Sequence, residues 1–247
     1  MTRFKTQAGP IIQLEKICFS YPGASEPVLN GLDLEIKSKE KIGLMAPNGT
    51  GKTTLLHTIM GLCRPESGQI KIFDTPMNTE KDFSSIRTRV GLLFQDSDDQ
   101  LFCPTVLDDV AFGPLNMGAS RSQAVDTSVK VLESLGIGEF QDSVTHRLSG
   151  GQKRLVALAA VMAMSPEILL LDEPTSGLDT TVKQKLTDIL NGLDISYLII
   201  SHDFNFLSKV TDKIFSMEAG KILTDDQIHV HHHEHFHKHG LQPHVHK

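Results

Sequence analysis

The chain lacks several features that mark whole classes of protein. Among its 247 residues there is no tryptophan, and there are only two tyrosines and three cysteines. No run of about 18 apolar residues occurs, so the sequence predicts no membrane-spanning helix. Cys18, Cys63 and Cys103 are odd in number and lack CxxC spacing, which excludes a disulfide scaffold and favours a reduced, cytosolic protein.

Basic residues and targeting signals are also scarce. The 24 Lys and Arg residues are outnumbered by 30 Asp and Glu residues, and the formal net charge is −6 with His neutral. This balance argues against a general nucleic-acid binder. The first ten residues, MTRFKTQAGP, lack the apolar core of a signal peptide. We therefore expect no nucleic-acid partner, and a protein that is cytosolic or is held on a membrane through a partner.

Runs typical of strands and helices alternate along the chain. Such alternation predicts an α/β fold with a mainly parallel sheet covered on both faces. Between about residues 96 and 160 the pattern becomes helical, which predicts a helical subdomain inserted into that fold. The expected strands are residues 11–19, 28–36, 41–46, 67–73, 90–94, 168–171, 197–201, 213–217 and 221–223, and the expected helices are 52–62, 122–135, 150–164, 180–190 and 204–210.

A glycine-rich segment follows the expected strand 41–46 and leads into the expected helix 52–62. Residues 46–54 read APNGTGKTT, close to the pattern GxxxxGK[ST], whose backbone N–H groups cradle phosphates. Lys52 would reach the β- and γ-phosphates, and the Thr53 hydroxyl would ligate Mg²⁺. Ala46 replaces the first glycine of the pattern, so it must keep an ordinary φ or carry strain. The candidate nucleotide ligands are Asn48, Gly49, Thr50, Gly51, Lys52, Thr53 and Thr54.

Two carboxylates end a strand that is apolar throughout. Residues 168–171 read ILLL, and Asp172 and Glu173 follow directly. Charges at the edge of a buried strand are costly to desolvate without a partner, and a Mg²⁺ ion beside the phosphate loop would be one. Asp172 is then expected to hold Mg²⁺ through water, and Glu173 to orient or activate the water that attacks the γ-phosphate.

A specific five-residue string opens the expected helix 150–164. Residues 148–152 read LSGGQ, and together with the phosphate loop and the two acids they make residues 11–226 resemble the ATP-binding subunit of an ABC transporter. The resemblance implies an ABC ATPase fold with an N-terminal antiparallel β subdomain, ATP and Mg²⁺ as cofactors, and ATP hydrolysis as the activity. It also implies head-to-tail pairing of two domains, with each ATP held between one phosphate loop and the partner's LSGGQ.

The resemblance assigns further residues in the order in which the family has them. Tyr21 would stack on adenine, Gln95 would lie in the Q-loop, and His202 would be the switch histidine. Asp179 lies in a segment that resembles the D-loop, and it equally fits the N-cap of the expected helix 180–190. The implied catalytic residues are Glu173, His202 and Gln95, the implied Mg²⁺ ligands are Thr53, Gln95 and Asp172, and the implied signature ligands of ATP are Ser149, Gly150, Gly151 and Gln152.

Residues 93–114 narrow the resemblance to one branch of the family. This stretch, LFQDSDDQLFCPTVLDDVAFGP, is similar to the ATPase subunits of energy-coupling-factor importers, especially those for cobalt and nickel. The similarity implies a second ATPase subunit in a homodimer or heterodimer, a membrane coupling subunit, a substrate-binding membrane subunit, and a peripheral position on the cytoplasmic face of the membrane. Alternatives are an importer of a vitamin or other solute, a soluble ABC-type ATPase not linked to transport, and a metal-storage protein with a decayed ATPase core.

Histidine is concentrated near the C-terminus. Nine of the 12 histidines lie in residues 229–247, HVHHHEHFHKHGLQPHVHK. Imidazoles at near-neighbour spacing chelate Ni²⁺, Zn²⁺, Cu²⁺ and Co²⁺, and this tract has almost nothing apolar to bury. We therefore expect residues 1–226 to form the ATP-binding cassette, and 227–247 to form a flexible tail that binds a transition metal. The candidate ligands in the tail are His229, His231, His232, His233, His235, His237 and His239.

Overall fold

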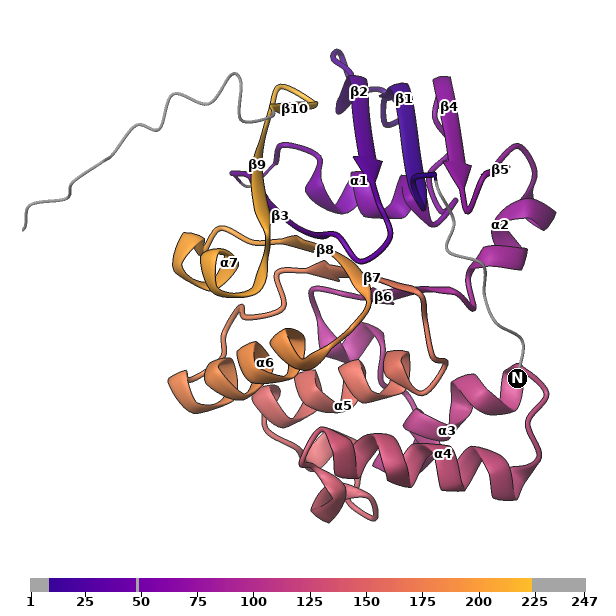
Figure 1. Ribbon diagram of the computed structural model, residues 1–247, viewed down its shortest axis with the longest axis vertical. Coiled ribbons are helices and arrows are strands. Elements are labelled where there is room, and N and C mark those ends of the chain that lie inside the picture. The colour runs from indigo at the N-terminus through magenta and orange to yellow at the C-terminus, as the bar shows by residue number, and fades with distance from the viewer. Residues whose placement is uncertain (1–8, 48, 224–247) are drawn as a thin grey trace, which may run out of the picture.

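The protein, seen in a computed structural model that describes residues 9–47 and 49–223, is built in layers. Figure 1 shows an antiparallel sheet at the top, a core sheet across the middle and a group of helices below it. None of the helices within the described ranges is long and apolar enough to cross a membrane. The histidine tract, with its seven candidate metal ligands, lies outside these residues.

The core sheet has six strands in the order β10-β9-β3-β8-β7-β6. Every pairing in it is parallel except that of β10 with β9. The predicted mainly parallel sheet is therefore confirmed. Since parallel strands end at the same edge, the adjacent strands β3, β8 and β7 bring their carboxyl ends together there. The strands are β3 (Lys41–Met45), β6 (Val90–Leu93), β7 (Ile168–Asp172), β8 (Ser196–Ile200), β9 (Lys213–Glu218) and β10 (Lys221–Leu223).

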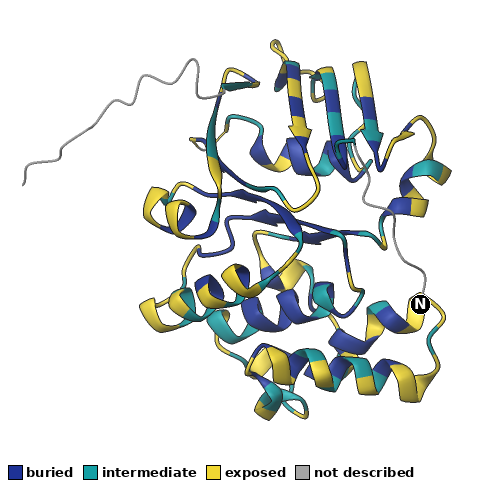
Figure 2. Ribbon diagram, in the orientation of Figure 1, coloured by how far each residue is buried: buried dark blue, intermediate teal, exposed yellow. Residues whose placement is uncertain are grey.

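Alternate residues of the core strands enter two different hydrophobic clusters. In β7, Ile168 and Leu170 pack into one cluster, and Leu169 and Leu171 pack into the other. The first cluster also contains the antiparallel sheet and helix α1 (Lys52–Ile59), and the second contains helices on the opposite face. A strand covered on both faces needs an apolar side chain at every position, which explains the unbroken ILLL run. Figure 2 shows these strands buried between two more exposed outer layers.

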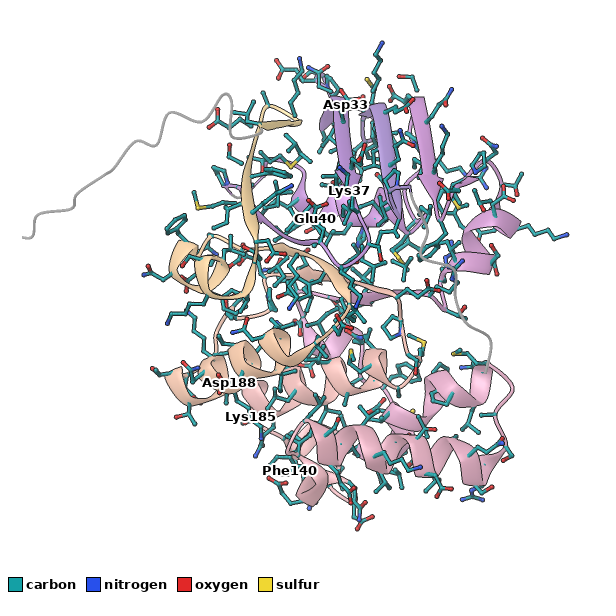
Figure 3. The ribbon with its side chains drawn as sticks, in the orientation of Figure 1. Asp33, Lys37, Glu40, Phe140, Lys185 and Asp188 are labelled. Carbon is teal, nitrogen blue, oxygen red and sulfur yellow. The ribbon has the colours of Figure 1, made fainter. Side chains whose placement is uncertain are left out.

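The N-terminal sheet has the order β2-β1-β4-β5 with antiparallel pairing throughout, which confirms the predicted antiparallel β subdomain. The turn after β2 ties this sheet to the core. There Glu40 accepts the Lys37 backbone N–H at 2.9 Å and the Lys213 ammonium at 2.7 Å. Lys37 and Glu40 lie next to each other in Figure 3. The strands are β1 (Ile12–Phe19), β2 (Leu29–Ile36), β4 (Ser67–Ile72) and β5 (Thr75–Pro76).

Helices cover the second face of the core sheet. In Figure 1, α5 and α6 lie nearest to this sheet, and α3 and α4 lie farther out. Lys185 of α6, labelled in Figure 3, donates a hydrogen bond to the Gly136 carbonyl at 2.6 Å, which ties α6 to the end of α4. The limits of an inserted helical subdomain at about 96 and 160 stay a prediction. These helices are α3 (Val106–Asn116), α4 (Arg121–Ser134), α5 (Gly150–Met162), α6 (Thr180–Gly192) and α7 (Phe204–Val210).

Two helices, α2 (Glu80–Ile86) and α3, are not predicted by the sequence pattern. Each begins at a threonine whose side chain accepts a backbone N–H of the first turn. Thr79 forms a capping box with Asp82, and Thr105 accepts the N–H of Asp108. Acidic residues near a helix N-terminus are stabilised by the helix dipole, so the acidic residues after Thr105 favour a helix start there.

The expected helix 52–62 ends three residues early, at Ile59. Gly61 has a left-handed φ of 71°, and a Cβ there would lie 2.3 Å from the ring of Phe83. Glycine in this conformation ends helices, since other residues pay a steric cost there. Three short 3₁₀ turns connect the helices: η1 (Ser97–Asp99), η2 (Gly138–Phe140) and η3 (Thr145–Arg147).

Candidate functional site

The predicted phosphate loop joins β3 to α1. Gly49 and Gly51 have φ values of 82° and 97°, which other residues adopt only with strain. A Cβ on Gly51 would also lie 2.8 Å from Val28 Cγ1, so this close approach requires glycine. Gly51 caps α1 without a side-chain hydrogen bond, which leaves the N–H groups of the first turn for an anion. Asn48 lies outside the described residues.

Lys52, the first residue of α1, is buried against an acid from another strand. Its ammonium donates to the Ala46 carbonyl at 2.9 Å and to Glu173 Oε1 at 3.0 Å. Ala46 does not have a positive φ, so the residue that replaces the first glycine of the pattern causes no backbone strain. Both charged side chains are almost fully buried, and charges taken out of water need such a partner. The structure thus places the loop lysine directly against the second acid of the Asp172-Glu173 pair.

Glu173 is held between this lysine and a histidine. Its Oε2 lies 2.9 Å from His202 Nδ1 and accepts the His202 backbone N–H at 3.4 Å. Glu173 has a left-handed φ of 43°, an uncommon conformation for a residue with a long side chain. The His202 side chain is 71% exposed, whereas that of Glu173 is 5% exposed. The buried Glu173 carboxylate is therefore held on both sides, by the Lys52 ammonium and by the exposed imidazole of His202.

Asp172 and Thr53 meet beside this cluster. The Thr53 hydroxyl donates to Asp172 Oδ2 at 2.6 Å, and the Asp172 Oδ1 atom is buried without a hydrogen bond. Burial raises the pKa of Asp172, and the hydrogen bond from Thr53 opposes that rise. No group of three or more His, Cys, Asp or Glu side chains within the described ranges could hold a metal ion. A cation here would rely on one carboxylate, the hydroxyl and ligand oxygens, which is a donor set that suits Mg²⁺.

Two cavities meet at Gln95, which follows β6. The larger, of about 760 Å³, is lined by Gln95, Thr53, Asp172 and, from the start of α5, Gly150. The smaller, of about 420 Å³, is lined by Gln95, Tyr21 and residues of the phosphate loop. The fold therefore places the predicted Q-loop glutamine in the wall of one cavity with the phosphate loop, and in the wall of the other with Thr53 and Asp172.

Tyr21 stands at the rim of the smaller cavity. Its hydroxyl lies 3.0 Å from Thr54 Oγ1, and its ring packs edge-on against Phe19 with the centroids 5.0 Å apart. The ring remains about half exposed. An aromatic ring fixed at both ends and open to solvent can stack on a flat ligand.

The LSGGQ residues form the start of α5 and engage one another. Ser149 and Gln152 make a capping box, with the Ser149 N–H donating to Gln152 Oε1 at 2.8 Å and the Gln152 N–H to Ser149 Oγ at 3.3 Å. Gly150 has open space where a side chain would lie, whereas a Cβ on Gly151 would meet Val182 of α6 at 2.9 Å. The signature therefore faces the larger cavity through Gly150 and packs on α6 through Gly151.

Asp179 has a local structural role. Its carboxylate accepts the Val182 N–H at 2.9 Å and so caps α6, which confirms the N-cap that the sequence allows. The preceding residues, Ser176, Gly177 and Leu178, line the larger cavity. A contact between Asp179 and a nucleotide stays a prediction.

Other side chains that line the larger cavity are not predicted by the sequence pattern, among them His57, Lys153 and Arg154. Arg154 lies four positions after Gly150 in α5, so helical periodicity places both on one face of the helix. The four-residue spacing from Gly150 therefore indicates, from the sequence, that Arg154 faces the same site. His57 stands four positions after Thr53 in α1 and packs edge-on against Phe94, with ring centroids 6.3 Å apart.

Known proteins share this arrangement over most of the chain. Residues 29–176 match the family model described as ABC transporter. A relative from Nitratidesulfovibrio vulgaris, provisionally described as an ABC transporter ATP-binding protein, is 46% identical over 98% of this chain and 88% of its own length. The cobalt import ATP-binding protein CbiO of Rhodobacter capsulatus is 40% identical over 87% of this chain and 78% of its own length.

A solved structure agrees with the fold. CbiO1 from Clostridium perfringens, described as part of the ABC transporter complex cbiONQ, superimposes with a TM-score of 0.77 at 33% identity. The match covers 87% of this chain and 87% of that protein.

A side chain at Gly151 would collide with α6, whereas one at Gly150 would not, and this difference can be tested. Gly151→Ala should lower the free energy of unfolding by about 1–3 kcal/mol, because its Cβ would overlap Val182. Gly150→Ala, which enters open space, should change that free energy by less than about 0.5 kcal/mol. Urea denaturation measures both values. Adding Val182→Ala to Gly151→Ala should restore part of the lost stability, and equal stability of the two single variants would contradict the proposed overlap.

Proposed function

Because the chain belongs to the ABC transporter family as an ATP-binding and ATP-hydrolysing subunit, we propose that it powers an energy-coupling-factor type importer of cobalt or nickel. The observation that carries this cargo class is the 40% identity to a protein named for cobalt import. The likeness of residues 93–114 to such ATPases adds to it. A vitamin or another solute as cargo, and an ABC-type ATPase not linked to transport, are the alternatives. Residues 1–226 would form the cassette.

The buried ion pair supports direct roles for Lys52 and Glu173 in hydrolysis. The phosphates of ATP carry more negative charge than one carboxylate, so they would compete with Glu173 for the Lys52 ammonium, now 3.0 Å away. Glu173 would keep its contact with His202, and its Oε1 would then accept a proton from the attacking water. With Nδ1 of His202 facing Glu173, Nε2 is the ring nitrogen that remains for the γ-phosphate.

The donor set beside this pair supports Mg²⁺ as the second cofactor. Thr53, Asp172 and Gln95 would hold the ion, since Asp172 Oδ1 is buried without a hydrogen bond and all three residues line one cavity. When bound, Mg²⁺ neutralises charge on the β- and γ-phosphate oxygens. Tyr21, beside the phosphate loop, would stack on adenine.

A second ATPase subunit would complete each ATP site. By helix geometry the N–H groups of Gly150 and Gly151 have no carbonyl partner within α5, and Gly150 leaves open space where a side chain would lie. Residues 149–152 are therefore suited to a phosphate that arrives from outside this chain, and the phosphate loop of a partner would bring one. Such a pair would hold two ATP molecules head to tail, in a homodimer or a heterodimer.

An exposed apolar patch on α3 and the segment before it supports docking to a membrane coupling subunit. Phe102 is 66% exposed and packs edge-on against exposed Phe112, with the ring centroids 4.8 Å apart. The buried Asp109 carboxylate fixes the loop below this pair, because its Oδ1 accepts the N–H groups of Phe102 and Cys103 at 2.9 and 2.8 Å. A pre-ordered aromatic pair is typical of an interface anchor. The protein would then lie peripherally on the cytoplasmic face of the membrane.

Glu173→Gln tests the proposed catalytic role. The amide keeps the shape of the side chain but cannot take a proton, so the ATPase rate should fall at least about a hundredfold. ATP should still bind and should trap a dimer that elutes earlier in size-exclusion chromatography. Glu218→Gln, an exposed position on β9, is the matched control and should hydrolyse ATP like the wild type. Wild-type turnover by Glu173→Gln would show that the assignment of Glu173 is wrong.

Phe112→Asp tests the proposed docking patch. A charge in the centre of an apolar contact should reduce co-purification with co-expressed membrane subunits by more than about tenfold. The ATPase activity of the isolated subunit should stay unchanged, because Phe112 lies outside the nucleotide site. Phe204→Asp on α7, which changes an equally exposed phenylalanine, should leave co-purification within about twofold of the wild type. If Phe112→Asp and Phe204→Asp co-purify equally well with the membrane subunits, α3 is not the docking surface.

Uptake of labelled cobalt and nickel tests the cargo class. Cells that express the chain with its native membrane partners should accumulate one of these metals, and Glu173→Gln should abolish that accumulation. Labelled vitamins serve as the comparison, and uptake of a vitamin with no metal uptake would favour the alternative cargo.

Removal of residues 227–247 in the same assay tests separately whether the predicted metal-binding tail contributes. Recovery of only ribosomal or DNA-repair proteins with the purified chain would overturn the transport function.

A further inference from the structure

Arg154 of α5 is a buried cation that donates hydrogen bonds to the backbone of the segment after β6. The residue is 4% exposed, and its guanidinium donates from Nη1 to the Phe94 carbonyl at 2.5 Å and from Nη2 to the Gln95 carbonyl. Burial lowers the pKa of Arg154, and the charges of Asp96 and Asp172 oppose this. Since a buried charge is costly, these two carbonyl contacts are a specific arrangement and not the contacts of a solvated surface arginine.

The two orphaned polar atoms of the described ranges belong to residues that line the same cavity. Arg154 Nε and Asp172 Oδ1 are the buried side-chain nitrogen and oxygen atoms there that have no hydrogen-bond partner. Both residues line the 760 Å³ cavity together with Gln95 and Thr53. A buried N–H without a partner is unfavourable, and the Nε–H of Arg154 is left in that state. The guanidinium therefore keeps its two hydrogen bonds to the loop carbonyls although its Nε–H makes none.

Other contacts between α5 and this loop are weaker or act farther from Gln95. Lys153 pairs with Asp98 at 2.5 Å, but Asp98 is largely exposed, and exposed ion pairs contribute little. The Gln100 amide reaches the carbonyls of Leu92 at 3.3 Å and Ala157 at 3.5 Å. Among the described side chains of α5, Arg154 is the one that hydrogen-bonds to Gln95 itself.

We propose that Arg154 is a positioning residue for ATP hydrolysis, which holds Gln95 in the site by fixing the two peptide groups that flank it. The proposal rests on the function proposed above for Gln95. The planar guanidinium contacts two successive carbonyls with two nitrogens, so it sets the orientation of both peptide groups as well as their position. A lysine ammonium is a point donor and cannot fix both carbonyls in this way. Arg154 lies in α5, and residues 149–152 form the N-cap and first turn of that helix. Through Arg154, the position of Gln95 is therefore coupled to the position of the signature residues.

Hydrogen exchange of the nucleotide-free protein tests the contact independently of activity. Arg154→Met should speed exchange of the amides of residues 94–99 by at least about tenfold, because the loop loses its anchor. Exchange in β7 and in the body of α5 should stay as in the wild type, and a general packing defect would speed exchange there too. Lys130→Met, which removes an exposed cation of α4 outside the cavity, is the matched control and should leave exchange of residues 94–99 unchanged.

Steady-state kinetics tests the consequence for the reaction. Arg154→Met should lower kcat at least about tenfold, with KM for ATP within about twofold, because the phosphate loop is untouched. The Mg²⁺ concentration that gives half-maximal rate should rise, since Gln95 is a proposed ligand. Lys130→Met should keep both kinetic constants within about twofold of the wild type.

Failure of the positioning role of Arg154 and failure of the proposed function would give different experimental results. Wild-type exchange at residues 94–99 in Arg154→Met, or a kcat within about twofold of the wild type, would overturn the positioning role. If the wild-type protein itself hydrolyses no ATP, the proposed function fails, and the exchange measurement still decides whether Arg154 holds the loop. If Arg154→Met does not fold, Arg154→Lys replaces it, with faster loop exchange and lower kcat as the expected result and wild-type behaviour as the contrary one.

Discussion

The buried ion pair between Lys52 and Glu173 is the constraint around which the rest of the site is arranged. Two successive acids end the fully buried strand β7, and each must find a partner away from water. Glu173 takes Lys52 and His202, whereas Asp172 takes Thr53 and keeps one oxygen unsatisfied. In the core sheet β8 lies between β3 and β7, so the segment after β8, which contains His202, stands between the phosphate loop and the two acids.

The same constraint explains why the site has two sides with different properties. On one side, the lysine, the glutamate and the histidine already satisfy one another, so a phosphate would have to enter by exchanging partners. On the other, Asp172 and Arg154 line one cavity, and each keeps one buried polar atom without a partner. Under the proposed function, the first side would take the proton of the attacking water, and the second would hold a cation beside Gln95.

Helix α5 connects these chemical groups to the rest of the molecule. Its first turn is closed by the Ser149–Gln152 cap, Gly151 packs on Val182 of α6, and Arg154 holds the segment after β6. That segment continues through η1 to the loop that Asp109 fixes under the exposed Phe102–Phe112 pair. A partner docked on this pair and a nucleotide beside Gln95 would therefore act on one continuous stretch of chain, and α5 packs along it.

The sequence by itself determined the fold class, the phosphate loop and the two acids of β7, because each depends on residues adjacent in the chain. An unbroken apolar run predicts a strand covered on both faces, and glycines before a lysine predict a loop that cradles phosphate. The sequence did not reveal α3, whose capped acidic start has the composition of a solvated loop. Only the tertiary structure decided that Lys52 pairs with Glu173, 121 positions away, and that Arg154 reaches the carbonyl of Phe94, 60 positions away. No local pattern encodes these contacts, since they arise when parallel strands carry separate segments to one edge of the sheet and the packing of α5 decides which side chains meet there.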